Sequence, residues 1–80
     1  MITTTFKIGE LTRTLNVHVF SWGVQVVIED KTPHWINRHF DARNFHLTKN
    51  YPTIESNIKR GMSYFKAPKD NVDEIIKNYK

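Results

Sequence analysis

The stretch LTRTLNVHVFSWGVQVVIE, residues 11–29, decides the fold of this chain. Apolar and polar residues alternate through Leu11–Phe20 and again through Val24–Glu29, and Arg13 is the exception on the apolar side of the first segment. Alternation with a period of two predicts strands with one buried and one solvated face, which is typical of antiparallel sheets. The short connection Ser21–Gly23 ends in a glycine that can take a positive φ, so the two segments are expected to form a β-hairpin.

The segments on either side of this hairpin extend the sheet. Ile2–Ile8 alternates in the same way and predicts a strand that a Gly9–Glu10 turn joins to the hairpin. After the hairpin, the cluster Asp30–Pro33 predicts a turn. The next segment, His34–Phe40, fits either a fourth strand or a helix with proline in its first turn. We expect the strand, because it would continue the meander, and Asp41–Asn50 is then a loop or a short final strand.

Two amphipathic helices are expected after the sheet, at about 52–66 and about 70–79. Asp70 is expected to cap the second helix. The sequence therefore predicts a single α+β domain over residues 1–80, in which a three- to four-stranded antiparallel meander at about 2–47 precedes two C-terminal helices packed on one sheet face. The apolar stripes of the helices comprise Ile54, Ile58, Met62 and Phe65 in the first and Val72, Ile75, Ile76 and Tyr79 in the second. The opposite sheet face is expected to be polar and open, with Thr12, Thr14, Asn16 and His18 on it.

Length and composition restrict the class of protein. Eighty residues, 39% of them apolar, suit one small globular domain with a thin core. Cysteine is absent, so disulfides and thiolate metal sites are excluded. The N-terminal sequence lacks a signal-peptide pattern and no apolar run is long enough to span a bilayer. We therefore expect a cytoplasmic protein without membrane contact. The net charge of +4 permits an acidic partner without requiring one.

Residue sets for catalysis or metal binding are weak. The four histidines show no spacing that would bring three metal ligands together, so neither a metal site nor a cofactor is expected. The serines lack a nucleophile-elbow context, and the glycines lie too far apart for a phosphate-binding loop. One enzyme class stays open, a metal-independent ribonuclease toxin that uses two histidines near cations. Its candidate residues are His39, His46, Arg38, Arg43 and Lys49.

Basic and aromatic residues are interleaved between residues 34 and 49 and again between residues 59 and 69. Such stretches contact nucleic acids or acidic protein surfaces, although the same rings also fill a thin core. Trp22 stands apart, because the expected hairpin loop would expose it, and exposed tryptophan is enriched in binding hot spots. The residues expected to contact a partner are Trp22, Trp35, Arg38, Arg43, Lys59 and Arg60.

The size, the lack of cysteine and the Lys/Asn/Ile-rich composition resemble small accessory proteins encoded by bacteriophages, which include anti-CRISPR inhibitors of host defence. The resemblance implies a non-enzymatic protein that occupies a surface of a larger protein or nucleoprotein complex in the host cytoplasm. Direct nucleic-acid binding through the basic-aromatic residues is the alternative. A monomer and a homodimer both fit the sequence, since the strand Ile2–Ile8 offers an edge that could pair with its symmetry mate.

Overall fold

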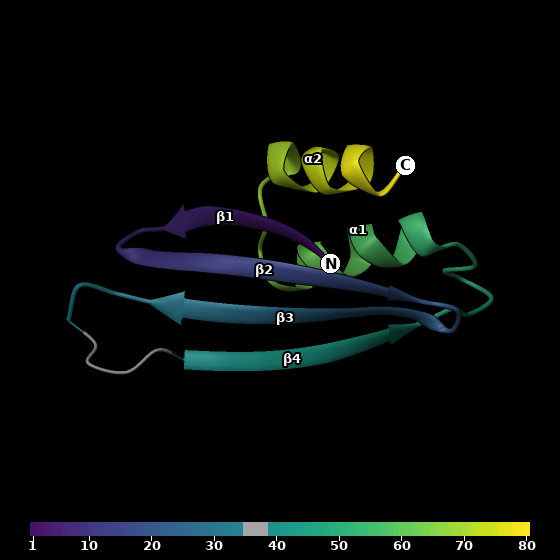
Figure 1. Ribbon diagram of the computed structural model, residues 1–80, viewed down its shortest axis with the longest axis horizontal. Helices are drawn as coiled ribbons and strands as arrows, with labels where there is room; N and C mark the ends of the chain where they lie inside the picture. Colours follow the sequence, from purple (N-terminus) through teal and green to yellow (C-terminus); the bar gives the residue numbers. More distant parts are fainter. Residues whose placement is uncertain (35–38) are drawn as a thin grey trace.

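A computed structural model describes residues 1–34 and 39–80 of the chain. In these ranges, four strands form one antiparallel sheet in the order β1-β2-β3-β4, and two helices follow it (Figure 1). The strands are β1 (Ile2–Ile8), β2 (Leu11–Phe20), β3 (Gly23–Lys31) and β4 (His39–His46), and the helices are α1 (Ile54–Tyr64) and α2 (Lys69–Tyr79). The predicted α+β meander with two C-terminal helices on the sheet is confirmed.

The register assigns each strand residue to one of two faces. Leu15 pairs with Thr4 on β1 and with Ile28 on β3, and Val24 pairs with Phe45 on β4. These residues face the helices and are buried with the apolar residues of α1 and α2. The twelve residues of the hydrophobic core are Phe6, Leu15, Val17, Val24, Val26, Ile28, Phe45, Ile58, Met62, Phe65, Ile75 and Ile76. The other face is named here the open face.

The helices occupy different parts of the helix side of the sheet. α1 packs mainly against β3 and β4, whereas α2 packs against β1 and α1. In Figure 1, α2 lies alongside β1, at the opposite edge of the sheet from β4. Asn71 on α2 fastens this arrangement, because its side-chain amide donates hydrogen bonds to the Thr4 hydroxyl (2.8 Å) and to the Thr5 carbonyl oxygen (3.2 Å).

The third and fourth strands differ from the prediction. β3 continues to Lys31, beyond the predicted end at Glu29, so Asp30 lies in a strand and not in a turn. The fourth strand was predicted at His34–Phe40, but it spans His39–His46, most of which was expected to be a loop or a short final strand. Residues 35–38 of the predicted strand lie outside the described residues. The strand was misplaced because the side chains of β4, except that of Phe45, are exposed and so show no alternating apolar pattern.

An ion pair explains why Asp30 belongs to β3. Arg13 and Asp30 are register partners on the helix side, and Nε and Nη2 of Arg13 each donate to one carboxylate oxygen of Asp30 at 2.7 Å. The remaining Nη1 donates to the Phe65 carbonyl oxygen at the end of α1 (2.9 Å). The hydrogen bonds with Asp30 raise the pKa of Arg13, against the opposing effect of partial burial. The arginine that interrupts the apolar pattern of β2 therefore joins two strands to a helix.

The helix ends show one confirmed and one wrong expectation. α1 lies within the predicted range of 52–66 and begins after Thr53, whose hydroxyl accepts from the Ser56 amide while Ser56 Oγ accepts from the Thr53 amide. This reciprocal capping box stabilises the helix start. For α2, Asp70 was predicted as the cap, but the helix begins one residue earlier and Pro68 stands at the N-cap position without a side-chain hydrogen bond. Asp70 lies in the first turn, where its charge suits the helix dipole.

Buried polar residues fix the connection between the sheet and α1. Asn57 is fully buried, and its side-chain nitrogen donates to the carbonyl oxygens of Tyr51 (2.9 Å) and Thr53 (2.8 Å). These bonds hold the loop before α1 against the helix.

Within the described ranges, neither helix is long and apolar enough to cross a membrane.

Candidate functional site

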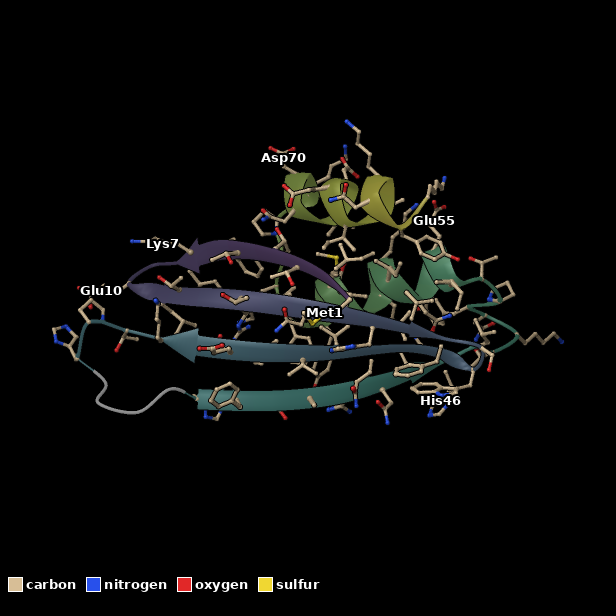
Figure 2. The ribbon with its side chains drawn as sticks, viewed as in Figure 1. Met1, Lys7, Glu10, His46, Glu55 and Asp70 are labelled. Carbon is tan, nitrogen blue, oxygen red and sulfur yellow. The ribbon has the colours of Figure 1, made fainter. Side chains whose placement is uncertain are left out.

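An exposed group of rings lies on the open face where β2 and β4 end and β3 begins. His18 and Phe20 lie on β2, Trp22 in the hairpin loop and His46 at the end of β4 (labelled in Figure 2). We call these four residues the aromatic row. Phe20 and Trp22 are stacked with their centroids 5.0 Å apart and their planes 6° from parallel, and Trp22 lies 4.8 Å from His46. Phe20 is 42% exposed and Trp22 37% exposed.

The register explains why these rings meet. Gly23 pairs with Phe20 on one side and with His46 on the other, so the place between the two rings carries no side chain. Both ring distances of Trp22 match the spacing of neighbouring strands, about 4.8 Å, so the indole stands between Phe20 and His46. The indole is stacked on the Phe20 ring, and the His46 ring is tilted by 35° against it.

Gly23 itself cannot be replaced easily. Its φ is +147°, a conformation that residues with a Cβ rarely adopt, and a Cβ built there would lie 2.1 Å from the Phe45 carbonyl oxygen. β3 and β4 therefore approach closely at this point because the residue is glycine. The Leu47 amide donates to the Trp22 carbonyl oxygen (2.9 Å), which also holds the hairpin loop against the end of β4.

The middle of the open face is polar and internally bonded, and its charged residue is Glu29, the register partner of Thr14. Thr3 donates to the Asn16 side chain (2.7 Å), and the hydroxyls of Thr5 and Thr14 are 3.1 Å apart. The register adds Gln25, Val27, Ala42 and Asn44 to this part of the face. The predicted polar surface is thus a ladder of amides and hydroxyls, several of which already have cross-strand partners.

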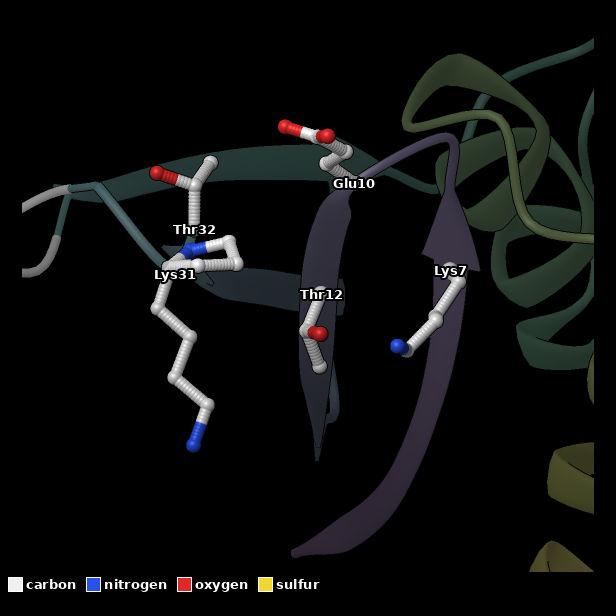
Figure 3. A pocket seen from close by; sticks show the side chains of 6 residues that line it. Lys7, Glu10, Thr12, Lys31 and Thr32 are labelled. Atoms are coloured by element: carbon white, nitrogen blue, oxygen red, sulfur yellow. The ribbon is translucent and has the colours of Figure 1, made fainter.

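Charges on this face gather at the end opposite to the aromatic row. Lys7 and Lys31 are the register partners of Thr12, one on each side, and Figure 3 shows both lysines extending to the same side of the sheet as Thr12. They border a hollow of about 230 Å³. Glu10 also lines this hollow and offsets part of the positive charge.

The four predicted partner-binding residues that the structure describes do not form one surface. Trp22 lies on the open face, whereas Arg43 pairs with Val26 and thus faces the helix side, where it lies over the Tyr64 ring (4.5 Å) and donates to its hydroxyl. Lys59 is on α1, near Glu55 (4.0 Å). Trp35 and Arg38 lie outside the described residues.

Arg60 is occupied by contacts within the chain. Its guanidinium lies over the rings of Tyr51 (4.2 Å) and Phe45 (5.3 Å) and donates to the His46 carbonyl oxygen (2.9 Å) and to the Asn57 side chain. These contacts join α1 to the end of β4. Arg60 thus supports the sheet end that carries the aromatic row, from the helix side.

The histidines of the ribonuclease hypothesis are not brought together. His39 and His46 stand at opposite ends of β4, about 24 Å apart for an extended strand. The register places His39 opposite Asp30 on the helix side and His46 opposite Gly23 on the open face. No group of three or more potential metal ligands occurs among the described residues.

The contact that the sequence did not indicate is that of His46 with Trp22. Phe20 was expected on β2 and His46 near a final strand, but their meeting depends on the register of β4, which no local pattern gives. The signal that was available is the glycine after Trp22, because a residue without a side chain leaves room for rings from both sides.

Comparisons with protein-family models, with curated proteins and with solved structures found no match for this chain.

Proposed function

We propose that the protein is a non-enzymatic binding domain that docks on a larger protein through the open face of its sheet, with Trp22 at the centre of the contact. The observation that carries the proposal is the exposed aromatic row. Hot spots in protein interfaces are enriched in tryptophan and tyrosine. A small inhibitor that acts by covering a surface of its target, alone or within a nucleoprotein complex, needs such an anchor and no catalytic group.

The chemistry of the open face favours a protein over a nucleic acid. Bases stack on exposed ring faces, but the Trp22 indole is already stacked on Phe20 and in contact with the His46 ring. The ladder beside the row carries no cation, and Glu29, the register partner of Thr14, adds a negative charge to it, whereas nucleic-acid contact depends on cations at phosphates. An apolar cluster beside polar hydrogen-bonding groups is the usual make-up of a protein interface.

A second candidate function, nucleic-acid binding, is supported by Lys7 and Lys31 on the same face. They flank Thr12, about 27 Å along β2 from Phe20. Two lysines would neutralise two phosphates and give a decrease of log affinity with log salt of about 1.4 on a single strand. Lys7→Gln with Lys31→Gln would remove this salt dependence.

The test compares Trp22→Ala with Tyr79→Ala. Tyr79 is a suitable control because it is 38% exposed, close to the 37% of Trp22, but belongs to α2 on the helix side. Tagged wild-type protein and both variants are used to recover partners from nuclease-treated lysate, and the recovered protein is then titrated in purified form. We expect one stoichiometric protein that binds wild type and Tyr79→Ala equally and loses about 2 kcal/mol or more of binding free energy with Trp22→Ala.

A second measurement separates the two candidates. Fluorescence polarisation with labelled single-stranded and duplex oligonucleotides at low salt is expected to show no binding. A protein partner that binds Trp22→Ala as tightly as wild type would contradict the protein-docking proposal. Oligonucleotide binding that Lys7→Gln and Lys31→Gln abolish would replace it with the second candidate.

A further inference from the structure

The two edges of the sheet differ in what covers them. α2 lies alongside β1, and the Asn71 amide donates to the outward-pointing Thr5 carbonyl oxygen (3.2 Å). The edge of β1 is therefore partly occupied by a helix. In Figure 1, neither helix lies outside β4, and every side chain of β4 except that of Phe45 is exposed.

Two hydrogen bonds identify the backbone groups of β4 that point away from β3. The Ala42 amide donates to the Asp41 carboxylate (2.8 Å), and the His46 carbonyl oxygen accepts from Arg60 (2.9 Å). In an antiparallel pair, every second residue of a strand directs its N–H and C=O groups to the same side. Phe40, Ala42 and Asn44 therefore present their N–H and C=O groups outward, as His46 does.

Such an edge is a template for another strand. Three residues of β4, Phe40, Ala42 and Asn44, direct their backbone groups outward. Among these described groups, only the Ala42 amide has a hydrogen-bond partner, which is the side chain of the preceding residue, Asp41. The remaining outward amide and carbonyl groups of the three residues are left to solvent or to another chain.

We propose that β4 pairs in an antiparallel manner with β4 of a second copy of this chain, with Ala42 on the twofold axis. Both Ala42 residues then exchange their N–H and C=O groups, and Phe40 of each copy pairs with Asn44 of the other. The two sheets become one continuous sheet of eight strands. This inference does not depend on the proposed docking function.

Charge selects this register from its neighbours. With Ala42 on the axis, Asp41 of each copy stands opposite Arg43 of the other, which makes two cross-strand pairs of opposite charge. A shift of the axis to residue 41 would place Asp41 opposite Asp41, and a shift to residue 43 would place Arg43 opposite Arg43. Opposite charges across strands stabilise pairing and like charges destabilise it. The edge is thus complementary to itself in one central register.

The side chains on the open face also fit a second copy. Phe40 is 60% exposed, the largest exposed fraction among the phenylalanines of the described strands. In the proposed register its diagonal neighbour is Ala42 of the second copy, whose small side chain leaves room for the ring. Each copy gives up the hydrogen bond from the Ala42 amide to its own Asp41, and that carboxylate becomes available to Arg43 of the other copy.

The first experiment measures molar mass by sedimentation equilibrium from micromolar to millimolar concentration. We expect wild type to reach twice the mass of one chain. Asp41→Arg and Arg43→Asp each turn two opposite-charge pairs into two like-charge pairs, so each should weaken association about tenfold. Lys7→Asp, which changes the net charge as Arg43→Asp does but on β1, should leave association unchanged.

Mixing the charge variants tests the register itself. A copy with Asp41→Arg carries two arginines at these positions, and a copy with Arg43→Asp carries two aspartates. An equimolar mixture should therefore form a heterodimer at concentrations at which each variant alone is monomeric. The double variant Asp41→Arg with Arg43→Asp should dimerise as wild type does.

Disulfide trapping gives a distance test in a chain that has no cysteine of its own. The Ala42 residues would form a hydrogen-bonded pair with Cα atoms about 5.5 Å apart, within disulfide range. Ala42→Cys should therefore cross-link on oxidation. Asn44→Cys is the control, because the two copies of residue 44 would be about 14 Å apart.

Three results would overturn the proposal. They are a single-chain mass for wild type at every concentration, a dimer that neither charge variant weakens, and cross-linking of Asn44→Cys as fast as that of Ala42→Cys. Ala42→Pro removes the amide on the axis without a loss from the β3–β4 ladder, and it should abolish the dimer while circular dichroism stays that of wild type. Loss of a different bound protein in this variant, with wild type monomeric, would assign the edge to another chain.

Discussion

Replacement of Arg13 by methionine should destabilise this domain more than replacement of its partner Asp30. The two side chains form a bidentate ion pair between β2 and β3, but their surroundings differ. The side chain of Asp30 is 4% exposed and that of Arg13 is 15% exposed. Arg13→Met therefore leaves a carboxylate in the interior without its cation, whereas Asp30→Asn leaves a guanidinium that can reach water.

The expected magnitudes follow from this difference. Removing one partner of a buried ion pair costs about 3–5 kcal/mol, and we expect Arg13→Met to fall in this range. Asp30→Asn should cost about 1–3 kcal/mol, because the amide oxygen still accepts one hydrogen bond and Arg13 keeps its bond to the Phe65 carbonyl oxygen. A domain of this length has a total unfolding free energy of about 4–12 kcal/mol, so Arg13→Met consumes a large part of it.

The double variant Arg13→Met with Asp30→Leu separates burial of charge from loss of packing. Two apolar side chains of similar volume avoid the desolvation of both ions, so the double variant should be more stable than Arg13→Met alone and about as stable as wild type. Urea unfolding followed by circular dichroism gives the free energies, provided that the m-values agree. Equal stability of Arg13→Met and wild type, or a double variant less stable than both single variants, would refute the reasoning.

Three further predictions concern stability and titration. Gly23→Ala should lower the free energy of unfolding by more than the roughly 1–2 kcal/mol expected for Gly9→Ala. Both glycines have a positive φ, but only at Gly23 would a Cβ meet a backbone atom, a carbonyl oxygen of β4. Thermal unfolding of the two variants compares these losses. The hydrogen bond from Lys80 lowers the pKa of Glu55. The contribution of this pair to stability is therefore present above the ordinary pKa of a glutamate and is lost as the pH falls through the lowered pKa of Glu55. Lys80→Ala should raise the Glu55 pKa in an NMR titration. Asn57→Ala should cost about 2–3 kcal/mol in urea unfolding, because two carbonyl oxygens lose a buried donor.

The central strands and both helices could be predicted from the sequence because each must bury an apolar face. Leu15 and Val17 on β2 and Ile58 and Met62 on α1 recur at the period of their element, and all four are fully buried. β4 could not be located in this way. It lies at the edge of the sheet, where Phe45 alone is buried, so its residues are free of the alternation that burial imposes on β2 and β3.

Local residue preferences misled the prediction at Asp30. An aspartate before Lys-Thr-Pro favours a turn. In the structure, its carboxylate meets Arg13 across the sheet, and the ion pair extends β3 by two residues beyond the expected end. Two residues departed from the expected pattern, Arg13 on the apolar side of β2 and Asp30 after the predicted end of β3. They form an ion pair with each other, and only the register of the strands brings them together.

The candidate site was partly accessible from the sequence. Trp22 could be placed in a hairpin loop because Gly23 follows it and strands flank it. Its stacking between Phe20 and His46 depends on the pairing of residues 23 and 46, which are far apart in the chain. Arg60 was expected on a binding surface, but its contacts with Tyr51 and Phe45 show that a cation near rings can serve the fold instead.

The contact of α2 with β1 has a consequence for how the protein is made. β1 packs against α2, which is synthesised after it, and the bond from Asn71 to Thr4 spans 67 residues. The hairpins of β2, β3 and β4 can form while synthesis continues, but Ile2–Ile8 gains its final cover only once α2 has left the ribosome. A nascent chain halted before Lys69 should therefore expose β1 to proteases and to other chains, so this domain becomes resistant only when α2 can pack against β1.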